Sequence, residues 1–248
     1  MIQEKIIMGV PIIINIRDSE AKQEYFDEVF NYFTYVDEKF STYKETSEIT
    51  AINNRKIKIE DASDNMKLIF KLSEETKKLT NGYFDILGRD GKYDPSGIVK
   101  GWSIFNATNI LRSRGVKNFT VEAGGDMEVS GKNDEDKLWC LGIQNPFSKK
   151  REIIKKVYLT NKGMATSGTY VRGQHIYNPK DKSVIINDIV SLTVIGPNIY
   201  EADRFVTAAF AMGNDGINFI EQLDGFEGYV VDSKGVATMT TGFNNYTQ

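Results

Sequence analysis

Residues 117–144 read KNFTVEAGGDMEVSGKNDEDKLWCLGIQ, and this stretch decides the fold class. Short runs of β-branched and aromatic residues alternate in it with turn sequences such as GGD and GKND, a pattern typical of consecutive strands. We predict strands at 117–122, 126–130, 137–144 and, just beyond, 152–159. Adjacent strands with no helix between them indicate an α+β fold instead of a regular α/β alternation.

The sequence on either side of this stretch mixes helical and strand patterns. Phe26, Phe30 and Phe33 recur at helical spacing within 19–40, so that segment is predicted to pack one face on a core. Further helices are predicted at 62–79, 97–113, 200–212 and 214–223, and further strands at 5–17, 164–177, 189–196, 227–232 and 236–241. The sequence shows no repeat or linker, so we expect residues 1–248 to form one compact domain.

The composition excludes several classes of protein. Of the 248 residues, 40% are hydrophobic and 26% are charged, which is usual for a globular protein. The formal net charge of −3 argues against nucleic acid as a partner, because binding phosphate backbones requires an excess of Lys and Arg. No apolar run reaches the roughly 18 residues of a membrane-spanning helix, and the first residues resemble a strand more than a signal peptide. We therefore expect no membrane insertion and a cytoplasmic location. Cys140 is the one cysteine of the chain, and its apolar surroundings in the sequence predict a buried thiol.

The segment 93–102, YDPSGIVKGW, combines a helix start with a lysine one turn further on. Ser96 is predicted to cap the helix, and the free N–H groups beyond it form a site for an anion. The Lys100 ammonium would reach a phosphate there or pair with Asp94. An ordinary capped helix with an exposed lysine explains the pattern equally well.

The segment 122–126, EAGGD, places two glycines between two predicted strands. Paired glycines permit positive φ or a close approach of the backbone to a ligand. A plain hairpin turn explains the same residues.

Hydroxyl side chains crowd the segment 164–170, MATSGTY, shortly before His175, the one histidine of the chain. Histidine suits proton transfer near neutral pH. A lone histidine is nevertheless more often structural than catalytic.

Asp203 and Thr207 stand four residues apart in a predicted helix, so their oxygens lie on the same face. Mg²⁺ often takes few protein ligands and completes its shell with water and substrate phosphate. In the alternative, which the residues alone favour, Asp203 stabilises the first helical turn and Thr207 bonds back to a carbonyl.

One further segment, 40–50, contains an aromatic residue among polar ones. Tyr43 is either a stacking surface or a half-buried core tyrosine, and the second is the commoner case. Ser47 with Thr50 is predicted to begin a short helix.

Taken in order, these segments resemble the ApbE-like family, the FAD:protein FMN transferases. The matching stretches are MGVP at 8–11, FSTY at 40–43 with SE at 47–48, TNGYFD at 80–85, DPSGIVKG at 94–101, AGGD at 123–126, ATSG at 165–168, HIYNP at 175–179 and AD at 202–203 with TA at 207–208. At 94–97 the sequence has proline and serine where many relatives have Leu-Gly, but Gly97 keeps its position. Many relatives also carry a lipoprotein signal and an anchoring cysteine. This sequence shows neither, which favours a cytoplasmic target or a trimmed exported chain.

The resemblance implies a fold and a set of site residues. The expected fold is α+β, with two interlocked parts, mixed or antiparallel sheets, flanking helices, and FAD in the groove between the parts. The metal, Mg²⁺ or alternatively Mn²⁺, is expected at Asp203, Thr207 and the Gly97 carbonyl. The residues expected against FAD are Met8, Tyr43, Tyr83, Phe84, Asp85, Asp94, Lys100 and Ile176, with Thr166 and Ser167 as phosphate donors. Catalytic roles are expected for His175, which matches the histidine near the reacting phosphate, and for Lys100 and Asp94.

The resemblance also implies an activity. The chain would cleave the FAD pyrophosphate with Mg²⁺, link FMN to an exposed Ser or Thr hydroxyl of an acceptor flavoprotein, and release AMP. Two alternatives stay open on the sequence. Water could replace the acceptor, which gives an FAD pyrophosphatase, or the chain could be a carrier that binds FAD and cleaves nothing.

Overall fold

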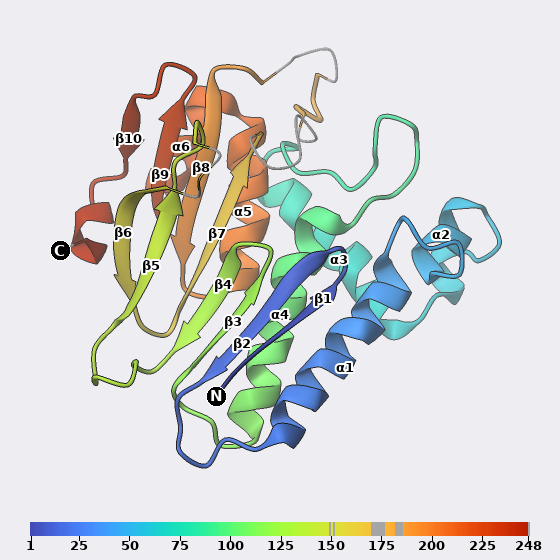
Figure 1. Cartoon of the computed structure of the whole chain (residues 1–248). Coiled ribbons are helices and arrows are strands. Elements are labelled where there is room, and N and C mark those ends of the chain that lie inside the picture. Colours follow the sequence, from blue (N-terminus) through green and yellow to red (C-terminus); the bar gives the residue numbers. More distant parts are fainter. Residues whose placement is uncertain (149, 151, 170–176, 182–185, 248) are drawn as a thin grey trace.

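The computed structural model describes residues 1–148, 150, 152–169, 177–181 and 186–247. Its largest element is a sheet in the order β1-β2-β3-β4-β7-β8-β9-β10, in which every adjacent pair is antiparallel. The strands are β1 Ile2–Ile7, β2 Val10–Ile16, β3 Phe119–Ala123, β4 Asp126–Ser130, β7 Lys162–Gly168, β8 Ile189–Gly196, β9 Glu227–Asp232 and β10 Ala237–Met239. A separate antiparallel hairpin, β5 Trp139–Gln144 and β6 Ile153–Leu159, lies in front of part of this sheet in Figure 1.

Helices α1 Gln23–Phe40, α4 Ser96–Ser113, α5 Ile199–Ala211 and α6 Gly216–Glu221 cover the opposite face of the sheet. Helices α2 Glu48–Asn53 and α3 Asp64–Leu79, with the 3-10 helix η1 Ile59–Asp61, extend beyond the sheet, where α2 packs on α1 and α3 on α4 (Figure 1). The 3-10 helix η2 Gly213–Asp215 joins α5 to α6, and η3 Phe243–Tyr246 packs on β6 and β9. Helix α4 packs against both α1 and α5, behind the sheet in the view of Figure 1. Antiparallel strands together with packed helices confirm the predicted α+β class.

The largest hydrophobic core lies between the sheet and its helices. Strand β2 alternates, so that Ile12, Ile14 and Ile16 are fully buried on the helix side. They meet the apolar stripe of α1, to which Phe26 and Phe30 belong, as predicted from its spacing.

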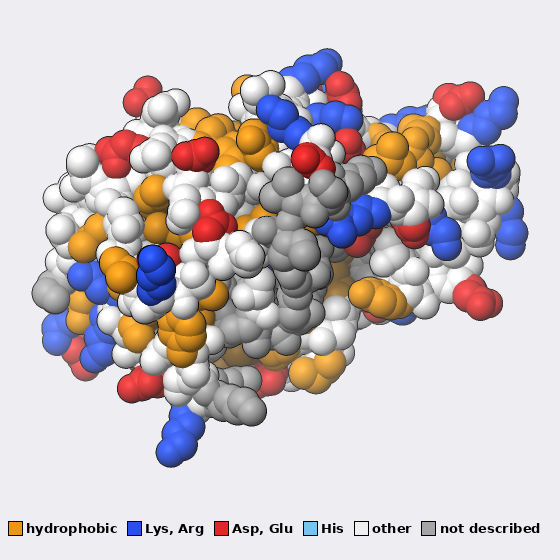
Figure 2. Space-filling model, turned by 90° about the horizontal axis from the view of Figure 1, so that it is seen from above, with side chains coloured by type: hydrophobic (Ala, Val, Ile, Leu, Met, Phe, Trp, Pro, Cys, Tyr) orange, Lys and Arg blue, Asp and Glu red, His pale blue; other side chains and the backbone are white. Residues whose placement is uncertain are grey.

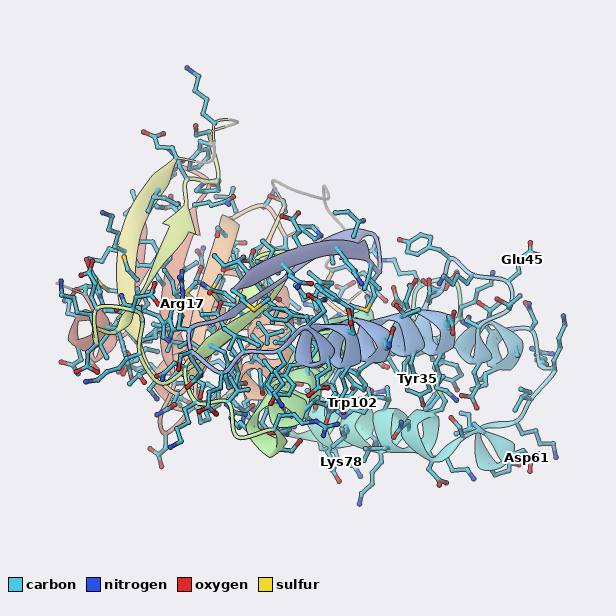
Figure 3. The ribbon with its side chains drawn as sticks, turned by 60° about the horizontal axis from the view of Figure 1, so that its bottom comes forward. Arg17, Tyr35, Glu45, Asp61, Lys78 and Trp102 are labelled. Atoms are coloured by element: carbon cyan, nitrogen blue, oxygen red, sulfur yellow. The ribbon has the colours of Figure 1, made fainter. Side chains whose placement is uncertain are left out.

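A second core joins the far end of α1 to α2, α3 and the beginning of α4. Trp102 lies between α1 and α3 in Figure 3, and its ring packs edge-on against Phe40 with centroids 5.8 Å apart. Phe84 and Ile86 are buried in the same core, which therefore anchors the irregular segment that leads into α4.

The β5–β6 hairpin forms a third core on the other face of the sheet. Trp139, Leu141 and Ile143 point inward, and the Trp139 indole N–H donates to the Ser130 carbonyl at 2.9 Å. Cys140, between two of these inward residues, is exposed. The expectation of a buried thiol was wrong, because successive residues of a strand face opposite sides.

Most predicted elements are confirmed with shifts of a few residues at their ends, and 189–196 and 227–232 are β8 and β9 as predicted. The predicted strand 5–17 is instead the hairpin β1–β2. Its two turn residues, Met8 and Gly9, have φ of 55° and 71°, as a type I′ turn requires. The predicted strand 164–177 ends at Gly168 within the described residues, and 170–176 lie outside them.

Candidate functional site

A groove of ≈ 1370 Å³ opens between the sheet, the start of α4 and the irregular segment before it. Its floor includes a row of side chains on the outer face of neighbouring strands, namely Glu4, Ile13, Glu122, Met127 and Met164. The volume exceeds the roughly 300–1,000 Å³ of most small-molecule sites, so the groove has room for a dinucleotide. Charges of both signs are interspersed over the face of the molecule shown in Figure 2.

Asp203 of α5 meets α4 at the inner wall of the groove. Its side chain is 2% exposed, and Oδ2 accepts a hydrogen bond of 2.7 Å from the Gly101 N–H. The contact requires glycine, because a Cβ at residue 101 would stand 2.5 Å from the Asp203 Cβ. Asp203 therefore binds the backbone of the neighbouring helix and does not cap its own.

Thr207 follows one turn later on the same face of α5. Its hydroxyl donates to the Asp203 carbonyl at 3.0 Å, which is the back-bonding role that the sequence allowed. A Cβ at Gly97 would lie 3.2 Å from the Thr207 Cγ2, so the two residues are direct neighbours across the two helices. The structure thus brings together Gly97, Asp203 and Thr207, as the resemblance implied.

Lys100 lies between two acidic side chains, neither of which is Asp94. Its ammonium forms an ion pair with Asp126 and stands 3.6 Å from Asp203 Oδ1. Of the two alternatives for Lys100, the pairing with Asp94 was wrong, because the ammonium lies between Asp126 and Asp203 while Asp94 stays at the helix start. Asp126 was not singled out from the sequence, although it closes the GGD motif.

The start of α4 has no side-chain cap, and Asp94 bonds the first N–H of the helix instead. Helix α4 begins at Ser96 itself, after Pro95, and the Ser96 N–H donates to Asp94 Oδ1 at 3.0 Å. The predicted Ser96 cap was wrong by this shift, since a residue inside the helix no longer caps it. Asp94 lines the groove beside the start of α4.

Burial controls the charge of this cluster. Burial, together with the neighbouring Asp126 carboxylate, raises the pKa of Asp203 to about 7 against the opposing effects of Lys100 and the Gly101 N–H. Two buried carboxylates therefore face one ammonium.

The β3–β4 turn places Asp126 at the groove. Gly124 and Gly125 have φ of 60° and 97°, which makes a two-residue type I′ hairpin. A Cβ on Gly124 would lie 3.1 Å from Val10 Cγ1. Both expectations for the paired glycines, positive φ and a hairpin, are confirmed.

Strand β7 carries the two hydroxyl residues expected at the phosphates. The Thr166 N–H donates to Asp126 Oδ1 at 2.9 Å, and the Thr166 hydroxyl lies 2.8 Å from that of Thr193. Thr166 and Ser167 both line the groove. Their role as phosphate donors stays a prediction.

Tyr83, Phe84 and Asp85 line the opposite wall of the groove. Phe84 is buried, and its N–H donates to the Thr80 hydroxyl at 3.1 Å. Asp85 pairs with Lys77 at 2.6 Å. These contacts hold the segment on the end of α3.

Tyr43 lies at the groove rim, in the loop between α1 and α2. Its side chain is 97% exposed, so the core alternative was wrong and a stacking surface remains. Ser47 caps α2 as predicted, with its hydroxyl accepting from the Thr50 N–H at 3.2 Å. Met8 packs against two of the cores at the β1–β2 turn, next to Gly9 and Val10, which line the groove.

His175 and Ile176 lie outside the described residues, so their expected roles stay predictions. The segment resumes at Tyr177, and Tyr177 and Pro179 line the groove.

The donor set suits a hard divalent cation. In the described part of the chain there is no cluster of three His, Cys, Asp or Glu side chains of the kind that holds a metal on its own. Asp203, Thr207 and the Gly97 carbonyl nevertheless offer oxygens only, the type that Mg²⁺ accepts together with water and phosphate. A further positive charge would also balance the two carboxylates beside Lys100. These residues fit the metal that the resemblance implied.

Among the described residues, no helix combines the length and the apolar character that crossing a membrane requires.

Residues 8–90 and 87–230 match the ApbE family. The chain belongs to the ApbE family. It is 32% identical over 130 residues to a protein of Vibrio cholerae named FAD:protein FMN transferase, a match that covers 49% of this chain and 39% of that protein. With the enzyme of the same name from Haemophilus influenzae it shares 29% identity over 167 residues, 62% of this chain and 48% of that protein. The chain thus aligns with less than half the length of these two relatives.

Solved structures of ApbE proteins share the fold over nearly the whole chain. The ApbE protein of Thermotoga maritima superposes with a TM-score of 0.86 at 20% identity, covering 100% of this chain and 99% of that one. The flavin transferase ApbE of Vibrio cholerae gives a TM-score of 0.85 at 21% identity, with 99% and 98% covered. The ApbE fold therefore persists here despite low sequence identity.

Proposed function

We propose that this protein is an FAD:protein FMN transferase that depends on Mg²⁺. The observation that carries the proposal is the meeting of Gly97, Asp203 and Thr207 beside Lys100, in a groove large enough for a dinucleotide. Relatives named FAD:protein FMN transferase support the choice of substrate.

The proposed reaction moves the FMN half of FAD. The oxygen of a Ser or Thr hydroxyl on an acceptor flavoprotein attacks the phosphorus of the FMN phosphate. The bond from that phosphorus to the bridging oxygen breaks, and AMP leaves with the bridging oxygen. The hydroxyl proton passes to a base, for which His175 is the candidate.

The residues of this chain position and stabilise charge. When bound, Mg²⁺ supplies Lewis-acid neutralisation of charge on the pyrophosphate and the leaving AMP. Asp203, Thr207 and the Gly97 carbonyl are the residues that would hold it. Lys100 presents an ammonium to the phosphates, and the Thr166 and Ser167 hydroxyls donate to phosphate oxygens. Tyr43, exposed at the rim, offers a ring on which the flavin stacks.

The test uses the full chain with FAD and Mg²⁺, with and without an acceptor flavoprotein domain that exposes a Ser or Thr in its flavinylation segment. Mass spectrometry then measures FMN mass on the acceptor and AMP in solution. FMN bound to the acceptor, with an equal amount of AMP and only when metal is present, is the expected result. Asp203→Ala should abolish it.

Two other results would favour a different activity. Free FMN and AMP with an unlabelled acceptor indicate the pyrophosphatase. Intact FAD that stays bound without regard to Mg²⁺ indicates the carrier. Full activity of Asp203→Ala contradicts the assignment of the metal ligands.

A further inference from the structure

Asp126 is a buried carboxylate that the proposed reaction does not use. Its side chain is 1% exposed and stands at the first residue of β4, directly after the Gly124–Gly125 turn. Oδ1 accepts the Thr166 N–H at 2.9 Å, and Oδ2 forms the ion pair with Lys100. Both oxygens are therefore engaged by groups of this chain, one from β7 and one from α4.

Lys100 has a second carboxylate within reach. Its Nζ is 3.6 Å from Asp203 Oδ1, the side chain expected to bind the divalent cation. A lysine ammonium and a metal ion compete for the same oxygen, because each neutralises the same charge. If Lys100 closed onto Asp203, the cation would have to displace it.

We propose that Asp126 is a positioning residue that holds the Lys100 ammonium closer to its own carboxylate than to Asp203, so that Lys100 does not close fully onto Asp203 and a divalent cation can reach the Asp203 carboxylate. The hydrogen bond from Thr166 fixes the orientation of Asp126, so its second oxygen points at Lys100. Held in this way, Lys100 stays at the groove wall beside Asp203. The inference rests on the Asp203 cation site of the proposed function.

The fold around Asp126 explains why the anchor is rigid. The type I′ turn fixes the chain entering β4, and Gly124 packs on Val10 of the neighbouring hairpin. A carboxylate on a strand held by such a turn has little freedom to follow Lys100 toward Asp203.

The test measures Mn²⁺ binding to the full chain without FAD by calorimetry at pH 8. Four proteins are compared: wild type, Asp126→Asn, Lys100→Met and the double variant. We expect Asp126→Asn to weaken Mn²⁺ binding about ten-fold, because the released ammonium pairs with Asp203. Lys100→Met should bind Mn²⁺ at least as tightly as wild type. The double variant should match Lys100→Met, since the competing ammonium is gone.

Several results would overturn the inference. Unchanged affinity in Asp126→Asn shows that Lys100 is not held in this way. A double variant as weak as Asp126→Asn shows that Asp126 is itself a ligand or a purely structural residue. Weaker binding in Lys100→Met shows that the ammonium does not compete, and this variant keeps the test decisive if Asp126→Asn fails to fold. A wild type that binds no Mn²⁺ also overturns it.

Two controls complete the design. Asp136→Asn removes an exposed carboxylate paired with Lys132 at 3.0 Å and should leave Mn²⁺ affinity unchanged. FMN transfer is assayed separately, so a wild type that binds Mn²⁺ but labels no acceptor contradicts the proposed function and leaves the role of Asp126 supported.

Discussion

The Gly101 N–H and the Asp203 carboxylate join two helices through one hydrogen bond of 2.7 Å. The donor lies inside α4, where its N–H would ordinarily bond within the helix, and the acceptor is a buried acid of α5. The bond fixes the orientation of Asp203 before any cation arrives. Much of what can be tested about this site follows from that contact.

Gly101→Ala should destabilise the protein. The new Cβ would meet the Asp203 Cβ at 2.5 Å and the Ile199 carbonyl at 2.9 Å, and overpacking of this kind costs about 1–3 kcal/mol. Glycine-to-alanine changes within helices ordinarily stabilise, so the sign is diagnostic. Urea unfolding measures the effect, and an equal or higher stability would contradict the close packing of α4 on α5.

Asp203 should make the stability of the metal-free protein depend on pH. Burial raises its pKa from near 4 to about 7, so between these values the folded state holds a proton that the unfolded state has lost. The stabilisation that this proton gives the folded state is complete below pH 4 and is lost as the pH rises through 7. Over that range the free energy of unfolding falls by at most about 1.4 kcal/mol per pH unit. Asp203→Asn, which keeps an acceptor for the Gly101 N–H, should make the difference in unfolding free energy between pH 5 and pH 8 smaller than in wild type. An unaltered slope would remove Asp203 as its source.

The same titration should affect metal binding in the opposite direction. A cation requires the ionised carboxylate, so Mn²⁺ affinity should rise as the pH increases from 6 to 8, with release of a proton. Calorimetry in buffers of different ionisation enthalpy counts that proton. Binding that is independent of pH would show that Asp203 is already ionised at pH 6.

Glu128→Ala should be one of the more damaging substitutions outside the groove. This buried carboxylate on β4 pairs with Arg112 of α4 and accepts the Ile199 N–H at 3.0 Å, where α5 begins. Arg112 is 35% exposed and can be hydrated when its partner is lost, so the main cost is the unpaired Ile199 N–H at the start of α5, about 1–3 kcal/mol. Glu135→Ala is the matched control, because its ion pair with Lys137 is exposed and should contribute nothing measurable. Equal losses in both variants would contradict the argument from burial.

Tyr43→Ala should weaken FAD binding while leaving the unfolding temperature unchanged. The ring is 97% exposed and contributes no core packing, so its removal affects only what binds at the rim. Base–aromatic stacking contributes about 1–3 kcal/mol, which corresponds to at least a five-fold rise in the dissociation constant. Fluorescence titration with FAD measures it, and an unchanged constant would place the flavin elsewhere in the groove.

The resemblance to one family, read from the order of the motifs, placed Gly97, Asp203 and Thr207 in one set although they are far apart in the sequence, and the structure brings them together. Helix α1 and strands β8 and β9 followed from periodicity alone, because their buried faces are continuous.

The features that the sequence did not predict are those that depend on tertiary packing. A pairing of Lys100 with Asp94, six residues away, was one of two expectations, but Lys100 pairs with Asp126, which the β3–β4 turn brings to it. No local pattern encodes that pairing. The β1–β2 hairpin was missed because its turn uses Met8 at positive φ, a position that glycine or asparagine usually marks.

The Gly101–Asp203 bond links residues 102 positions apart, and it has a consequence for how the protein is made. During synthesis, α4 and the strands after it emerge long before α5 exists, so the proposed cation site cannot form until residues near 207 have left the ribosome. Contacts of such long sequence separation form late and slow folding. A cation that binds at the proposed site therefore cannot guide the early steps of folding, in which the first strands of the sheet pair.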